Sequence, residues 1–215
     1  MVGIEILLLI PFSLNYRIFN KEQRLIFYYL ITCGIYGIGT DLLARAYGNN
    51  MAFVSAMMLV QFVILTFFYL HVLKNTGHLH KIIKVFLALA CVLFAVDMLF
   101  IEGMLRFNSI FVSFRTFLLI AYGVIFFLQL MKDEGLIEQS IYINSLPVFW
   151  FNAGLFVNFC CSFLLSLTFN FIQQGGPDEV LRSIYQITAG LTWSAGIIQA
   201  ILFYIGLSKI KRARA

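Results

Sequence analysis

Long apolar runs, separated by short charged or turn-rich segments, dominate the pattern of this chain. A helix needs roughly 20 mostly apolar residues to cross a bilayer. Seven runs meet or approach that length, at 2–18, 25–45, 51–72, 82–102, 108–131, 146–171 and 183–208. The pattern therefore predicts an all-α, polytopic transmembrane bundle of about seven helices, with residues 1–215 forming a single domain.

The first run is the weakest, because it is short and is interrupted by Glu5 and Pro11. It differs from a signal peptide in two respects: no basic residue precedes its apolar core, and no small-residue cleavage site follows it. Positive charge comes after it instead, at Arg17, Lys21 and Arg24. We therefore expect a retained first helix whose N-terminus lies outside.

Basic residues fall mainly on alternate connections. All seven lysines lie after the first, third or fifth run or in the C-terminal tail. Because cytoplasmic loops of membrane proteins are enriched in Lys and Arg, this asymmetry predicts an N-out, C-in orientation.

Composition supports the membrane class. Hydrophobic residues make up 61% of the chain and charged residues only 12%, whereas soluble domains carry about a quarter charged residues. The net charge of +5 comes from short clusters between apolar runs rather than from one basic face. We therefore expect the lipid bilayer as a partner and no nucleic acid.

Ionisable residues inside the runs are candidates for function, because a charge in hydrocarbon is costly. In the expected orientation, Arg115, Asp97 and Asp41 all lie in the outer third of their helices. Arginine stays charged and needs an acidic partner or water, so we expect Arg115 to pair with Asp97 or, as second choice, with Asp41. The pair could fix helix packing only, or it could line a wet outward-facing cavity for a small polar or anionic ligand.

Uncharged polar residues extend this hypothesis. One face of the last run carries Thr192 and Gln199, and Gln61 lies near the middle of the third run. Such side chains often form hydrogen bonds between membrane helices, and this is the more frequent role for any one of them. The candidate ligand-binding residues are Arg115, Asp97, Asp41, Gln61 and Thr192.

Several chemistries lack the residues that they need. The last run has no lysine before Lys209 that could carry retinal, and His71, His78 and His80 cluster at a basic turn. Nucleotide-binding and hydrolase motifs do not occur. We therefore expect no catalytic residue, no metal and no cofactor, and a protein that is not an enzyme.

The segment Leu146–Leu155, with Trp150, Asn152 and Gly154, resembles the "FWxNxGxL" start of helix six in a group of uncharacterised seven-helix integral membrane proteins of Bacteroidetes-type bacteria. The segment Phe107-Asn108-Ser109, followed by Arg115, resembles the start of its helix five. Gln61 departs from the group, which more often has Glu there, and this weakens any proton-linked role. The resemblance implies a multi-pass protein of the inner (cytoplasmic) membrane with a sensory or accessory role, but no known ligand.

The leading functional hypothesis is a receptor-like or accessory protein that senses a small ligand or the state of the membrane. Its short loops and tail leave no room for an output domain, so the signal would pass to a separate membrane or cytoplasmic signalling partner. A small carrier or channel with an outward-facing polar site is the alternative, and a purely structural subunit is the third.

Overall fold

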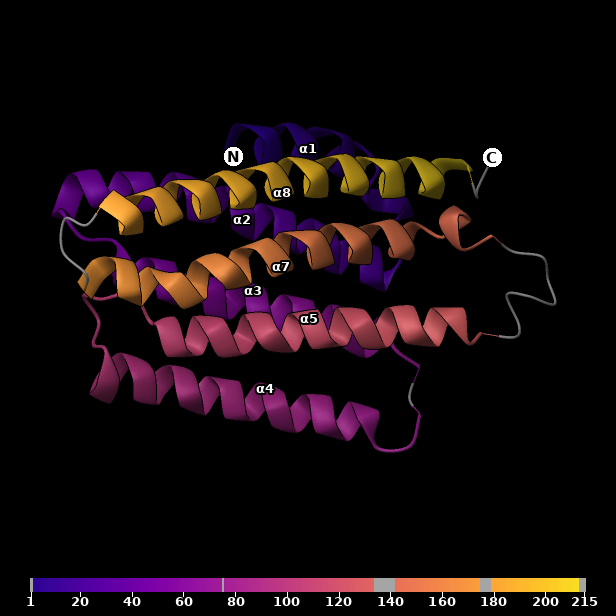
Figure 1. Cartoon of the computed structure of the whole chain (residues 1–215). Coiled ribbons are helices and arrows are strands. Elements are labelled where there is room, and N and C mark those ends of the chain that lie inside the picture. Colours follow the sequence, from indigo (N-terminus) through magenta and orange to yellow (C-terminus); the bar gives the residue numbers. More distant parts are fainter. Residues whose placement is uncertain (1, 75, 134–141, 175–178, 213–215) are drawn as a thin grey trace.

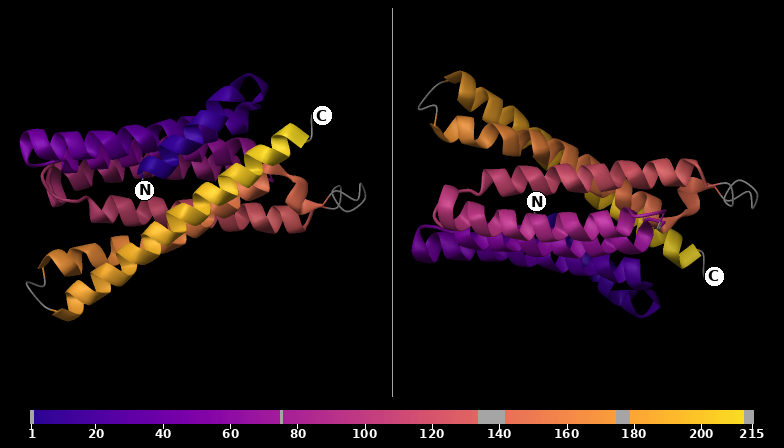
Figure 2. Two further views of the ribbon diagram at one scale, coloured as in Figure 1. Left: turned by 90° about the horizontal axis from the view of Figure 1, so that it is seen from above. Right: turned by 90° about the horizontal axis from the view of Figure 1, so that it is seen from below.

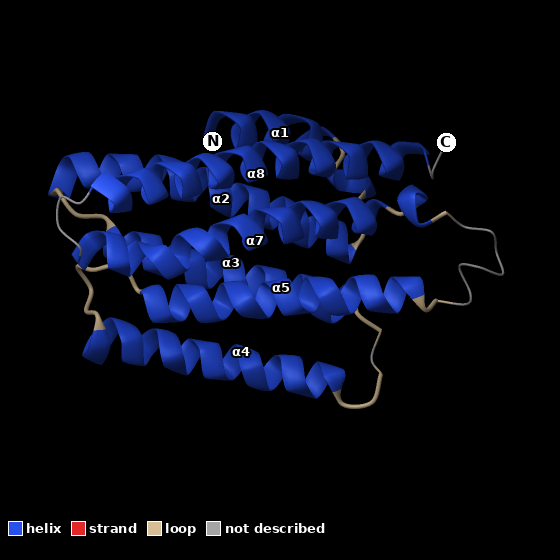
Figure 3. Ribbon diagram, in the orientation of Figure 1, coloured by secondary structure: helices blue, strands red, loops and turns tan. Residues whose placement is uncertain are grey.

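The computed structural model describes residues 2–74, 76–133, 142–174 and 179–212, and every regular element within these ranges is helical (Figure 3). A π-helical turn (Asp97–Ile101) continues α4, and short 3-10 turns occupy Tyr16–Ile18 and Ile143–Ser145. The α-helices are α1 (Val2–Leu14), α2 (Lys21–Tyr47), α3 (Met51–Val72), α4 (Leu79–Val96), α5 (Ser109–Met131), α7 (Pro147–Gln174) and α8 (Glu179–Arg212).

Six helices are long and apolar enough to cross a bilayer: α2, α3, α4 with its π-helical turn, α5, α7 and α8. The chain is therefore a helical, multi-pass membrane protein. The shorter α1 has 13 residues, which gives a length of about 20 Å, whereas the hydrocarbon core of a bilayer is about 30 Å thick. The predicted crossing over 2–18 is thus too short to be a full span, because its helix ends at Leu14.

The basic connections share one end of the bundle. Figure 1 shows the C-terminal ends of α1, α3, α5 and α8 at one end of the bundle and those of α2, α4 and α7 at the other. We call these the basic end and the opposite end. The alternation that the charge pattern predicts is therefore present in the fold, and the side of the membrane that each end faces stays a prediction.

Local sequence signals set the ends of α2. Before its first turn, the Asn20 backbone N–H donates to Gln23 Oε1 at 2.9 Å, and the Asn20 side chain accepts in return from the Gln23 backbone N–H, which completes a capping box. At its other end Gly48 has a φ of 68°, a left-handed conformation that glycine adopts without steric penalty. The chain then turns directly into α3.

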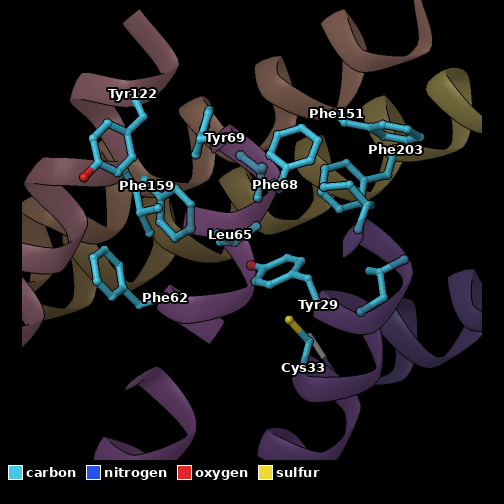
Figure 4. Close-up of a cluster of buried hydrophobic side chains, with 14 of the residues drawn as sticks. Tyr29, Cys33, Phe62, Leu65, Phe68, Tyr69, Tyr122, Phe151, Phe159 and Phe203 are labelled. Carbon is cyan, nitrogen blue, oxygen red and sulfur yellow. The ribbon is translucent and has the colours of Figure 1, made fainter. Parts of the chain in front are cut away.

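Glycines bring α7 and α8 close together. A Cβ at Gly154 would lie 3.0 Å from the Phe203 ring, and one at Gly206 would lie 2.7 Å from the Phe151 ring. These two rings are fully buried and pack edge to face at 5.6 Å (Figure 4). Small residues at helix contacts and interlocked aromatics thus hold the α7–α8 pair, as expected for membrane helices that gain little from the hydrophobic effect.

Only part of α8 packs into the bundle. None of residues 183–194 is buried, whereas buried positions recur every three or four residues from Ala195 to Ile210. In Figure 2, α7 and α8 diverge from α2, α3 and α5 towards the opposite end. The bundle is therefore tightest in the half nearer the basic end.

We expect Gly206→Ala to lower the free energy of unfolding by about 1–3 kcal/mol, because the new methyl group overpacks a closed contact with Phe151. Gly190→Ala is the matched control on the same helix, since a Cβ there meets nothing within 4 Å. That control should be neutral or stabilising by up to about 1 kcal/mol. Thermal unfolding in detergent measures both, and equal stability of the two variants would contradict the proposed contact.

Candidate functional site

Arg115 lies inside the bundle, about two helical turns from the start of α5. The side chain is 7% exposed, and its Nη1 donates to the Met58 backbone carbonyl of α3 at 3.2 Å. Its Nε is buried without a hydrogen-bond partner. A guanidinium has five N–H donors, so this one hydrogen bond to the described residues leaves most of its hydrogen-bonding capacity unused.

The polar surroundings of Arg115 come from α2 and α3. Tyr29, Cys33 and Tyr36 of α2 are within electrostatic range of the guanidinium. Gln61 of α3 donates to Cys33 Sγ at 3.6 Å, which confirms that Gln61 faces the interior of the bundle. We call these residues, Arg115 included, the Arg115 centre.

Asp97 does not pair with Arg115. Neither of the two ion pairs found among the described residues includes either side chain. The Asp97 Oδ2 instead accepts from the Phe111 backbone N–H at 3.0 Å, in the first turn of α5. Acidic groups are favoured at such a helix start, and the predicted ion pair is therefore wrong.

A second acid joins Asp97 at the start of α5. The two Glu102 oxygens accept from the Ser109 backbone N–H and hydroxyl, both at 2.5 Å. Asn108 occupies the N-cap position but makes no capping bond with its side chain, because Asp97 and Glu102 satisfy those donors. Asp97 and Glu102 thus stabilise a helix terminus, and no acidic side chain among the described residues forms an ion pair with Arg115.

Asp41, the second predicted partner, lies on the surface of α2. Its Oδ2 is 2.9 Å from Nη2 of Arg45, one turn further on, and both side chains are more than half exposed. An exposed pair of this kind stabilises a helix by at most a few tenths of a kcal/mol. The prediction that Asp41 faces the Arg115 centre is therefore wrong.

Thr192 also lies outside the centre. It is partly exposed, and its hydroxyl donates to the Thr188 carbonyl of its own helix at 2.9 Å. Gln199 of the same predicted face does reach the interior, where its Nε2 lies 3.4 Å from the Tyr29 hydroxyl. The two residues differ because α8 packs into the bundle only from Ala195 onwards, which leaves Thr192 outside and brings Gln199 inside.

A separate polar junction joins three helices deeper in the bundle. The buried Tyr69 hydroxyl of α3 donates to Asn152 Oδ1 of α7 at 2.9 Å, and Asn152 Nδ2 donates to the Gly123 carbonyl of α5 at 3.3 Å. A Cβ at Gly123 would lie 3.2 Å from the Phe156 ring of α7, a tight contact, so this glycine lets α5 and α7 approach closely. Asn152 therefore links α7 to both α3 and α5.

The sequence carried only a weak signal for the acid caps. Glu102 and Asp97 lie 6 and 11 residues before Asn108, whereas the acids that mark a helix start lie in its first turn. Arg115 offered no comparable signal for its contact with Met58, because a backbone carbonyl can come from any residue.

Among the described residues, no group of three or more His, Cys, Asp or Glu side chains could hold a metal ion. No protein-family model, curated protein or solved structure matches this chain. The geometry of the Arg115 centre therefore carries the functional argument.

The cap role of Asp97 predicts a difference between two substitutions. Asp97→Ala removes the acceptor for the Phe111 N–H and should lower the free energy of unfolding by about 1–2 kcal/mol. Asp97→Asn keeps an acceptor oxygen and should lose much less. Thermal unfolding in detergent distinguishes the roles, because a counter-ion of Arg115 would make Asn as damaging as Ala.

Proposed function

We propose that this chain is a receptor-like or accessory protein of the bacterial inner membrane that binds a small polar or anionic ligand at the Arg115 centre. The observation that carries the proposal is a buried guanidinium that donates to the Met58 carbonyl and has no acidic partner among the described residues. A charge that only fixed packing would need such a partner, because removing an unpaired ion from water costs several kcal/mol.

The chemistry of the centre fits an anion. A guanidinium matches carboxylate and phosphate groups with paired N–H donors. Around it, the tyrosines and Gln61 can offer further neutral donors. An anionic ligand would supply the negative charge that the bundle lacks and would meet the unused donors of Arg115.

Binding at Arg115 has a physical route to the basic end. Arg115 and Gln129 lie on the same helix, about 21 Å apart along its axis. Gln129 contacts the α3–α4 loop twice: its Oε1 accepts from the Lys74 N–H at 2.8 Å, and its Nε2 donates to the Lys74 carbonyl at 3.2 Å. A shift of α5 on ligand binding would therefore move this loop.

No connection between the described helices is long enough to hold an output domain. The longest connection between described helices, 132–146, is far shorter than a domain of at least 50 residues. We propose that a membrane or cytoplasmic signalling partner contacts the basic end. Affinity capture from native membranes tests this, and recovery of only lipids and this chain would count against it.

The proposed orientation places the basic end in the cytoplasm. With the four native cysteines replaced by alanine, we expect a cysteine at exposed Thr76 to react with an impermeant maleimide only in inside-out vesicles. A cysteine at Tyr47, which is 78% exposed at the opposite end, should react only in intact cells. The reverse result would invert the orientation.

Arg115→Met should abolish stabilisation of the protein by its anionic ligand. The same change removes an unpaired buried charge, so unliganded protein should keep its stability or gain up to about 4 kcal/mol. Thermal shifts with a panel of small carboxylates and phosphates measure both effects. Arg45→Met, at an exposed pair, is the control and should leave the ligand response unchanged.

A carrier is the second candidate, supported by polar contacts that continue inward from Arg115 through Gln61–Cys33 to Tyr29–Gln199. Proteoliposomes separate the two functions. Solute flux that is lost in Arg115→Met would indicate a carrier, whereas binding without flux would support the receptor.

A further inference from the structure

A π-helical turn brings two acidic side chains together at the opposite end of the bundle. The Glu102 backbone N–H donates to the Asp97 carbonyl, five residues earlier, at 2.9 Å, which is the hydrogen-bond pattern of a π-helix. In an α-helix, with about 3.6 residues per turn, residues five apart point to different faces. Here both side chains reach the first turn of α5 and lie within hydrogen-bonding range of each other.

The two acids differ in their access to water. Asp97 is fully buried, whereas Glu102 is partly exposed. Oδ2 of Asp97 accepts from the Phe111 N–H, but its Oδ1 is buried without a hydrogen-bond partner. Ionised carboxylates can only accept hydrogen bonds, so two ionised acids in contact repel each other and one of them favours the protonated form.

No basic side chain among the described residues neutralises this pair. On α5, Arg115 bonds to a backbone carbonyl of α3 instead, and residues 51–70 of α3 include no charged side chain. In the α4–α5 connection, Arg106 is exposed and takes part in neither of the ion pairs that the described residues form. On α2, Asp41 and Arg45 pair with each other on the surface.

We propose that Asp97 and Glu102 bind one proton between them and that release of this proton loosens the junction of α4 with α5. The proton resides on Oδ1 of Asp97, which then donates to a carboxylate oxygen of Glu102. Oδ2 of Asp97 still accepts from the Phe111 N–H, and ionised Glu102 still accepts from Ser109. One proton thus gives the unpartnered oxygen a hydrogen bond and reduces two neighbouring charges to one. On release, the proton passes to water on the side of Glu102.

This junction is important because little else holds that end of α4. The buried residues of α4 are Ile83 and Ala90, and near its end Phe94 packs edge to face on Phe111 at 5.0 Å. Loss of the proton would place two negative charges in contact and weaken the caps on α5. The acid pair is separate from the Arg115 centre, so this inference goes beyond the proposed function and does not depend on it.

Asp97→Asn is the sharpest test, because an amide copies the protonated acid: its oxygen accepts from the Phe111 N–H and its NH₂ group donates to Glu102. The folded chain holds a proton that the unfolded chain releases above about pH 4, so stability falls as the pH rises until the folded pair has lost it. In detergent, the melting temperature of the unsubstituted chain should fall by about 3–5 °C for each tenfold difference in proton affinity between the two states. Asp97→Asn should lack this fall.

Two further variants complete the comparison. Asp41→Asn, which changes the exposed pair with Arg45, is the matched control and should keep the pH dependence of the unsubstituted chain. Glu102→Gln removes the other charge, so it should abolish the pH dependence at the cost of one bond to Ser109. It keeps the test valid if Asp97→Asn fails to fold.

Infrared spectroscopy of the full chain in nanodiscs detects the proton directly. At pH 7 we expect the C=O band of a protonated carboxylic acid, which Asp97→Asn should lack and Asp41→Asn should retain. Spin labels at Phe100→Cys and Phe117→Cys, in a chain without its native cysteines, measure the junction, since both positions are more than half exposed. Their distance distribution should broaden above the pH at which the band disappears, and it should stay narrow when Asp97→Asn is added.

Absence of the protonated band at pH 7 would overturn the inference, as would an equal pH dependence of stability with and without Asp97→Asn. Stabilisation by Mg²⁺ or Ca²⁺ that Asp97→Asn abolishes, without a protonated band, would assign the acids to a metal ion and overturn it as well. A distance distribution that does not change with pH would overturn the proposed loosening of α4.

Discussion

The hydrogen bond from Tyr69 to Asn152 is the contact around which the bundle is arranged. It joins α3 to α7 at a fully buried point, and Asn152 continues to the backbone of α5. In a membrane, an unsatisfied amide or hydroxyl is expensive, so these groups must meet and the three helices must approach closely. Gly123 makes that approach sterically possible. Close packing continues between α7 and α8, where Gly154 contacts Phe203 and Gly206 contacts Phe151.

The positions of the charged residues near the start of α5 follow from a different constraint. The first N–H groups of α5 need acceptors in a place where little water is present. Asp97 and Glu102 supply them, and the acids nearest in sequence to Arg115 are thereby committed to a helix terminus. Arg115 is left with a backbone carbonyl of α3 and the weak dipoles of α2. Because the acids are separated from it, Arg115 is a candidate anion-binding residue.

The divergence of α7 and α8 gives that centre its structural setting. The tight half of the bundle contains the Tyr69–Asn152 junction, while residues 183–194 of α8 leave it and carry no buried side chain. A short α1 covers α8 beside a small cavity that Tyr29, Cys33 and Gln199 help to line, and it leaves an apolar groove along α8. The bundle thus combines a buried polar junction, the Arg115 centre and an apolar groove between α1 and α8.

Length and hydrophobicity alone determined that most of this chain crosses a membrane, because a helix must satisfy its own backbone hydrogen bonds in lipid. They gave the bounds of α3 to the residue and the grouping of basic loops at one end. That the ionised Arg115 would face the bundle interior was also readable, because an arginine deep in an apolar run needs a polar contact. Which acid pairs with which base was not, since Asp97 and Asp41 lie at similar levels and only the direction of each helix face decides between a cap, a surface pair and a counter-ion. The structure likewise decided that α1 falls short of a full span, because its helix ends at Leu14. It also decided that Thr192 stays outside the bundle, because α8 packs against its neighbours only from Ala195 onwards.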